Sequence, residues 1–183
     1  CWGSNSLGQR GDTGSDGAIL HPHEFGSEVT SVATGAVHSC AAVAGTAHCW
    51  GHNGRRQVLA EGADSITAPT PVPDVSDAQA LVAGDAFTCA VDGAGDVTCW
   101  GDNRFGQLGR GTTAIEPRAG RVALAPGVVA VALTAGERHA CALVREGGTD
   151  DRSPYCWGSD RHGLLGVGRR LRARSPLPVV LPA

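Results

Sequence analysis

The chain has 183 residues, enough for one domain with a hydrophobic core. Its 27 glycines and the lack of helical apolar periodicity favour short strands joined by turns. The formal net charge is −3, and the chain contains arginine but no lysine; this charge predicts no nucleic-acid partner. No apolar run is long enough to span a bilayer. Because the chain starts without methionine and inside a repeat, we expect a fragment or a processed product.

Short strands are expected in the same order all along the chain. Alternating residues, apolar runs and glycine-containing turns mark them as hairpins of an all-β fold. The turn Ala44-Gly45 is tight, whereas the corresponding loop near the C-terminal end runs from Val144 to about Ser153. The expected strands are 29–33, 35–43, 46–50, 80–83, 84–91, 97–100, 128–133 and 136–143.

This order recurs because the stretch Cys99–Gly109 (CWGDNRFGQLG) has related copies that begin at Cys1, Cys49 and Cys156. A period of about fifty residues is typical of propellers, solenoids and arrays. The predicted repeat units of the single domain 1–183 are 1–48, 49–98, 99–155 and an incomplete 156–183.

Six of the seven cysteines fall into pairs at matching places. Pairing Cys89 with Cys99 in an antiparallel hairpin sets Val91 opposite Val97, and opposed residues of this kind lie within disulfide reach. We therefore expect three disulfides and an oxidising compartment, with Cys1 left over. The expected pairs are Cys40–Cys49, Cys89–Cys99 and Cys141–Cys156.

Two other uses of the cysteines rank lower. The pairing Cys1–Cys40, Cys49–Cys89 and Cys99–Cys141 leaves Cys156 over and requires strands distant in sequence to meet, so it ranks second. Zinc ranks third, because no Cys-x-x-Cys occurs and two cysteines per hairpin fall short of four ligands.

Every tryptophan directly follows the cysteine that opens a repeat, so on a strand it points to the opposite face. A large ring at one strand position in every unit suits packing between successive sheets better than stacking on sugars. Core positions are therefore expected for Trp2, Trp50, Trp100 and Trp157.

With the Cys99–Gly109 stretch and the Gly-x-x-x-x-Cys-Ala strand, the chain resembles the regulator of chromosome condensation repeat family, in its bacterial, cysteine-bearing branch, over essentially its whole length. The resemblance implies β-propeller blades of four antiparallel strands. About three and a half blades would form an open arc, part of a seven-bladed ring. The structural repeat positions it implies are Asn5, Asn53, Asn103, Gly35, Gly84, Gly136, His38 and His139, with Phe87 in the histidine's place in one unit.

The second copy departs from this pattern. Arg56 and Leu59 stand where the other copies have glycine, so we expect a distorted turn there. In the fourth copy Asp160 replaces the asparagine and Leu164 the glutamine.

Several short motifs are expected to be structural, and no catalytic residue, cofactor or metal is predicted. The integrin-type tripeptide Arg10–Asp12 falls in the family's turn, and the arginines at 169, 170, 172 and 174 favour a solvated loop. Three aspartate or histidine pairs lack complete ligand sets: Asp12 with Asp16, Asp92 with Asp96, and His21 with His23.

We expect a non-enzymatic propeller that is extracellular, at the cell surface or periplasmic, and that binds an unidentified protein partner through loops. The loops that differ between units are 12–28, 60–78, 110–127 and 145–154, and loops commonly carry recognition. The remaining blades of a parent chain are a further partner. Nucleotide exchange with chromatin binding, or an accessory role in a larger secreted enzyme, are the alternatives that stay open.

Overall fold

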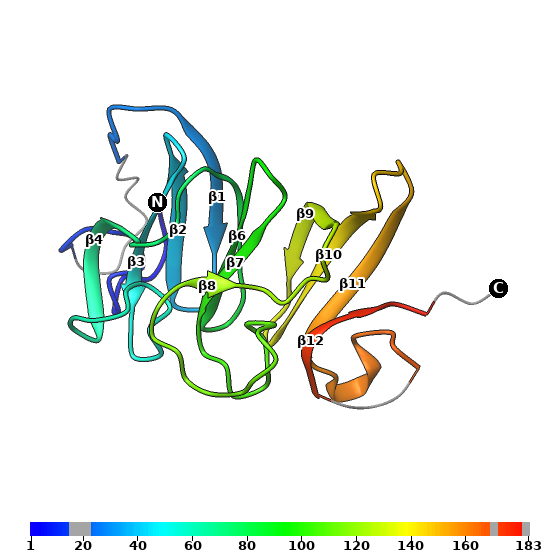
Figure 1. The fold of residues 1–183 in the computed structure, drawn as a ribbon. Coiled ribbons are helices and arrows are strands. Elements are labelled where there is room, and N and C mark those ends of the chain that lie inside the picture. Colours follow the sequence, from blue (N-terminus) through cyan, green and yellow to red (C-terminus); the bar gives the residue numbers. More distant parts are fainter. Residues whose placement is uncertain (15–22, 169–171, 181–183) are drawn as a thin grey trace.

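The computed structural model describes residues 1–14, 23–168 and 172–180, and consists of three four-stranded antiparallel sheets that stand side by side (Figure 1). The helical element in the described residues is one short 3-10 helix, Arg161–Gly163. No helix in the described residues is long and apolar enough to cross a membrane. The first sheet has β1 (Val29–Thr34), β2 (His38–Val43), β3 (Thr46–His52) and β4 (Ser65–Pro71). The second has β5 (Ala78–Ala83), β6 (Phe87–Asp92), β7 (Val97–Gly101) and β8 (Gly120–Arg121), and the third has β9 (Val128–Ala135), β10 (His139–Glu146), β11 (Arg152–Ser159) and β12 (Arg172–Pro178).

The hairpin at the centre of each sheet has the register expected from the sequence. Cys89 lies opposite Cys99, and Val91 opposite Val97. Disulfides join Cys40 to Cys49, Cys89 to Cys99 and Cys141 to Cys156, each with a Cα–Cα distance of 4.1 Å. Each bond closes the loop of one hairpin, which restricts the unfolded chain more than the folded one.

The sheets are offset from the sequence repeats. The repeat boundaries at 48/49, 98/99 and 155/156 fall inside β3, β7 and β11, so each sheet takes its first two strands from one repeat and its fourth from the next. The strands β1, β5 and β9 of successive sheets contact one another and form the inner edge, as expected of propeller blades.

Tryptophans join each sheet to the loop of the sheet before it. Trp100 on β7 is 1% exposed and donates its indole N–H to the carbonyl oxygen of Gln57 at 3.0 Å, and Trp157 donates in the same way to Gln107 at 2.9 Å. Trp50 donates to Gln9 at 2.9 Å. The expectation of core packing is correct for these three rings.

Trp2 is the exception, because 75% of it is exposed. It borders a hollow of about 490 Å³ whose other walls include Val32, Gly35 and His38, and no sheet of the described chain packs against that side. The prediction that all four tryptophans are buried is therefore wrong at this end of the arc.

A buried histidine also links the first two sheets. His38, at the start of β2, is 1% exposed, and its Nε2 lies 2.8 Å from the hydroxyl oxygen of Thr88 on β6. A Cβ on Gly35 would lie 2.5 Å from both His38 Nδ1 and the carbonyl oxygen of Gly84, so only glycine fits at this approach. Gly84 with Phe87 and Gly136 with His139 repeat the arrangement.

The loop after the third strand is held by an asparagine in each repeat. Asn103 is fully buried; its Oδ1 accepts from the Leu108 amide, and its Nδ2 donates to the carbonyl oxygens of Thr112 and Ala114. Asn5 and Asn53 accept from the corresponding amides.

The expected distortion at Arg56 is not observed. Its φ of 61° is the left-handed value that Gly106 adopts at 81°, and its amide donates to the Asn53 carbonyl oxygen as Gly106 does to Asn103. The turn thus keeps its shape at Arg56 and places the strain of that φ on a residue with a side chain. At Leu59 it does depart from the other copies, because Leu59 lacks the positive φ of Gly11, Gly109 and Gly166.

Candidate functional site

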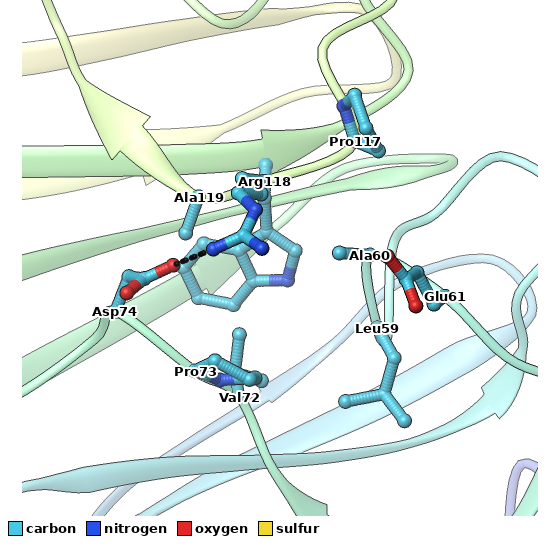
Figure 2. Close-up of a pocket in the computed structure, with 10 residues that line it drawn as sticks. Leu59, Ala60, Glu61, Val72, Pro73, Asp74, Pro117, Arg118 and Ala119 are labelled. Atoms are coloured by element: carbon cyan, nitrogen blue, oxygen red, sulfur yellow. Dashed lines mark ion pairs between the residues drawn. The ribbon is translucent and has the colours of Figure 1, made fainter.

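A cleft of about 300 Å³ opens where the first sheet meets the second (Figure 2). It is built by the segment after β3, the connection from β4 to β5, and the end of the loop before β8. Two of the loops predicted to carry recognition, 60–78 and 110–127, supply most of its wall. The lining residues are Leu59, Ala60, Glu61, Val72, Pro73, Asp74, Trp100, Pro117, Arg118 and Ala119.

The next junction shows why this place is open. There a Cβ on Gly109 would lie 2.9 Å from the indole of Trp157, so the backbone lies directly against the ring. Gly109 also accepts a hydrogen bond from the Ala123 amide at 2.9 Å, which ties the two segments together. Nothing larger than a glycine fits between them.

Two substitutions remove this closure in the cleft. Leu59 occupies the glycine's position without its positive φ, and its amide donates to Asn53 Oδ1 at 2.9 Å. Pro73 occupies the position of Ala123, and proline has no amide hydrogen to donate. The segments therefore separate beside Trp100.

The cleft combines an apolar wall with a charged rim. Leu59 is partly exposed in it, and Val72 and Trp100, which are 5% and 1% exposed, line it as buried apolar side chains. At the rim, Arg118 Nη1 lies 3.7 Å from an Asp74 carboxylate oxygen, and both side chains are more than half exposed (Figure 2). An ion pair so exposed contributes little stability, so a ligand can displace it at low cost.

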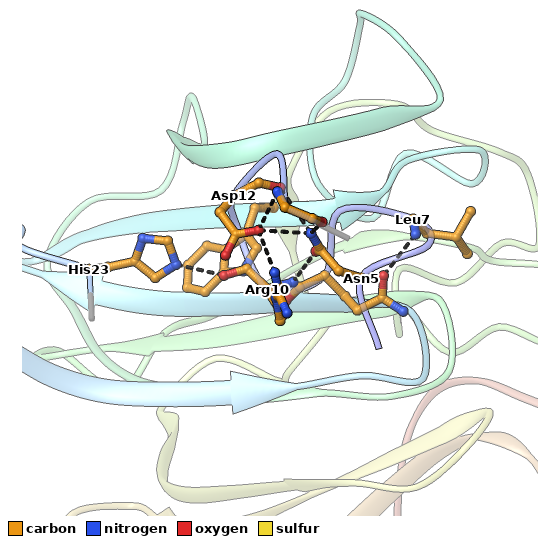
Figure 3. A network of polar contacts seen from close by, with 8 residues as sticks. Asn5, Leu7, Arg10, Asp12 and His23 are labelled. Atoms are coloured by element: carbon orange, nitrogen blue, oxygen red, sulfur yellow. Dashed lines mark hydrogen bonds and ion pairs between the residues drawn. The ribbon is translucent and has the colours of Figure 1, made fainter. Parts of the chain in front are cut away.

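The Arg10–Asp12 tripeptide is a structural element. Arg10 is 2% exposed, and its Nη2 donates to Asp12 Oδ1 at 2.9 Å (Figure 3). The same carboxylate oxygen accepts from Asn5 Nδ2 at 2.8 Å, while His23 Nε2 lies 2.6 Å from the Arg10 carbonyl oxygen. A guanidinium held in this way is not presented to a receptor.

Most of the other short motifs are structural elements as well. Asp92 Oδ1 accepts from the amides of Ala94 and Asp96, which makes the segment a turn. Within the described ranges, no group of three or more histidine, cysteine, aspartate or glutamate side chains could hold a metal ion. Asp16, His21, Arg169 and Arg170 lie outside the described residues.

The expectation of a loop for the arginine cluster is wrong at Arg172 and Arg174, because both lie in β12, the strand that completes the third sheet. Both are exposed, as expected of solvated arginines.

Burial sets the protonation of the two repeat histidines. Removal from water, together with a smaller contribution from the nearby His52, lowers the pKa of His38 to about 4. Partial burial also lowers the pKa of His139, although Asp160 opposes the shift. Both rings are thus neutral at pH 7, and the group within hydrogen-bond reach of His38 is the hydroxyl of the fully buried Thr88.

Sequence reasoning identified the loops but not the cleft. The sequence signal for the cleft is the pair Leu59 and Pro73. These residues lie on separate segments, so their joint effect becomes visible only when the structure places them side by side.

Comparisons with known proteins agree with the geometry. Two family models described as "Regulator of chromosome condensation (RCC1) repeat" match residues 79–107 and 94–143. The Arabidopsis thaliana ultraviolet-B receptor UVR8 is 31% identical over 152 residues, which cover 79% of this chain and 33% of that protein. The human probable E3 ubiquitin-protein ligase HERC4 is 30% identical over 187 residues, 98% of this chain and 17% of that protein.

Solved structures share the fold. Human WBSCR16 superposes with a TM-score of 0.80 at 24% identity, covering 99% of this chain and 47% of that one. Prp20p from Saccharomyces cerevisiae gives 0.75 at 18% identity, covering 97% and 43%. This chain therefore spans less than half of each of these proteins. Its repeats, its three four-stranded blades and these matches show that the chain belongs to the regulator of chromosome condensation (RCC1) repeat family.

Proposed function

We propose that this chain is a non-catalytic propeller module that binds a segment of a protein partner in the cleft between its first two blades. The observation that carries the proposal is the Leu59–Pro73 opening, which exposes apolar wall where the next junction is closed. An apolar side chain of the partner would enter beside Trp100, and Glu61, Asp74 and Arg118 would contact its polar neighbours.

The test is to fill the cleft. Ala119 lines it, so Ala119→Trp would occupy the space without altering a charge. Peptides selected from a random displayed library on the unaltered chain should bind Ala119→Trp at least about tenfold more weakly. Ala125→Trp, which adds the same ring at an exposed position outside the cleft, should leave their affinity unchanged. If the selected peptides bind Ala119→Trp as tightly as the unaltered chain, the cleft is not the binding site.

The proposed location is an oxidising compartment: extracellular, at the cell surface or periplasmic. The three disulfides support it, because such bonds persist chiefly outside the reducing cytosol. In protein isolated from its native source and denatured without reductant, the six cysteines of these three pairs should not react with a thiol reagent. Reaction of all six would place the protein in a reducing compartment.

The binding partners of the relatives do not carry over to this chain. Prp20p has binding properties to Gsp1p and histones, but at 18% identity its likeness to this chain concerns the fold alone.

A further inference from the structure

Three arginines converge on one aromatic ring where the second blade meets the third. The guanidinium carbons of Arg138, Arg172 and Arg104 lie 5.0, 5.1 and 6.0 Å from the ring centroid of Phe105, within cation–π range. Phe105 follows β7, Arg138 precedes β10 and Arg172 opens β12, so the fold brings together three separate segments. These four residues are called the arginine–phenylalanine cluster below.

One of the three positive charges is neutralised from inside the protein. Asp102 is 4% exposed, and both of its carboxylate oxygens accept from Arg104 Nε, at 2.9 and 3.0 Å. Gln107 Nε2 donates to the same carboxylate. The hydrogen bond and the charge of Asp102 raise the pKa of Arg104, with a further contribution from the charge of Asp85. Asp102 thus fixes the position of Arg104, and its carboxylate has little capacity left to accept hydrogen bonds from the other two arginines.

The other two charges face solvent. Arg138 Nη2 donates at 2.9 Å to Glu137, whose side chain is 68% exposed. Arg172 is exposed and makes no ion pair with any carboxylate in the described ranges. The ring therefore holds two solvent-facing guanidinium groups near each other, and a single exposed carboxylate offsets only one of their charges.

We propose that the arginine–phenylalanine cluster is a second interaction surface, which binds an acidic segment of a protein through its carboxylates. Guanidinium groups present forked donors that match a carboxylate, and the ring holds them in place before binding. The incoming carboxylates would bind Arg172 and displace Glu137 from Arg138. Glu137 is then an internal competitor for the same site.

Nucleic acid is the disfavoured occupant of the cluster. Asp85, Asp102 and Glu137 surround it, and the chain carries a net charge of −3, so a dense row of phosphates would be repelled on most sides. A short acidic peptide segment can place its few carboxylates on the arginines alone. The surface is independent of the cleft, which lies at the other junction.

The test uses the full 183-residue chain and a fluorescein-labelled hexaglutamate peptide in about 20 mM salt, where screening is weak. Fluorescence anisotropy should show Arg172→Gln weakening binding about three- to fivefold and Glu137→Gln strengthening it about two- to fivefold. Arg145→Gln, which removes the same charge at the far end of β10, should change nothing. Circular dichroism checks that all three variants remain folded.

The opposite effects of Arg172→Gln and Glu137→Gln are the signature of the site, because general loss of folding weakens binding in both. Equal affinity of all variants for hexaglutamate, or no binding at all, would overturn the proposal. Oligothymidylate binding that is tighter than hexaglutamate binding and is lost in Arg172→Gln would assign the surface to nucleic acid instead and would also overturn it.

Discussion

Stability of the first blade junction should depend on pH through His38. Its folded-state pKa of about 4 lies below the ordinary 6.5, so the unfolded chain takes up a proton between these values and the folded chain does not. Stability is therefore full above about pH 6.5 and is lost as the pH falls toward 4. A shift of this size corresponds to about 3 kcal/mol in total, of which about 2 kcal/mol is lost at pH 5.

The chain supplies its own reference for this effect. At the next junction the positions of His38 and Thr88 are held by Phe87 and Ala140, which lie in one hydrophobic cluster. The double variant His38→Phe/Thr88→Ala copies that apolar pair and removes the titrating ring together with its buried partner. Because both partners are replaced, no buried polar atom of the pair is left unsatisfied.

Urea unfolding followed by tryptophan fluorescence, at pH 7.5 and pH 5, measures the effect. The unfolding free energy of the unaltered chain should fall between these pH values by about 2 kcal/mol more than that of the double variant. Taking this difference cancels the other titrating groups, His139 included, whose pKa is also lowered. Equal losses in the two proteins would refute the assignment of the effect to His38.

Three further predictions concern the architecture. Replacing Cys89 and Cys99 by alanine should lower the unfolding free energy by about 3 kcal/mol, measured by urea denaturation, because the loop they close becomes free in the unfolded chain. Asn103→Ala should cost about 2–4 kcal/mol in the same assay and speed amide exchange in its loop, since buried loop groups lose their partners; unchanged exchange would contradict the role given to this side chain. Gly109→Ala should lower the melting temperature, because the new Cβ would lie 2.9 Å from Trp157 and the residue has a φ of +65°; an unchanged value would show that the junction can relax.

The parts of the fold that depend on local pattern could be predicted. Cys89 and Cys99 fix a hairpin register because opposed positions on an antiparallel pair follow from the turn between them. The repeated Asn and Gly positions are likewise local, since each asparagine binds its own loop.

What depends on contact between segments could not be predicted. The opening beside Trp100 requires both Leu59 and Pro73, and each residue alone reads as a tolerable loop variation. Arg172 reads as part of a solvated run until β12 brings it over Phe105. The exposure of Trp2 has the same origin, because burial of a ring depends on what packs beside it and not on its own strand.

The offset between repeats and sheets has a consequence for how such a chain can change in length. Each repeat begins in the middle of a β-strand such as β3 and ends in the middle of β7, so it carries the loop of one blade and the first two strands of the next. Gain or loss of a whole repeat during gene duplication would therefore leave every remaining contact surface matched to its neighbour. Every repeat opens with its own Cys-Trp, so the loop of the repeat before it would again meet an indole, as Gln57 now meets Trp100.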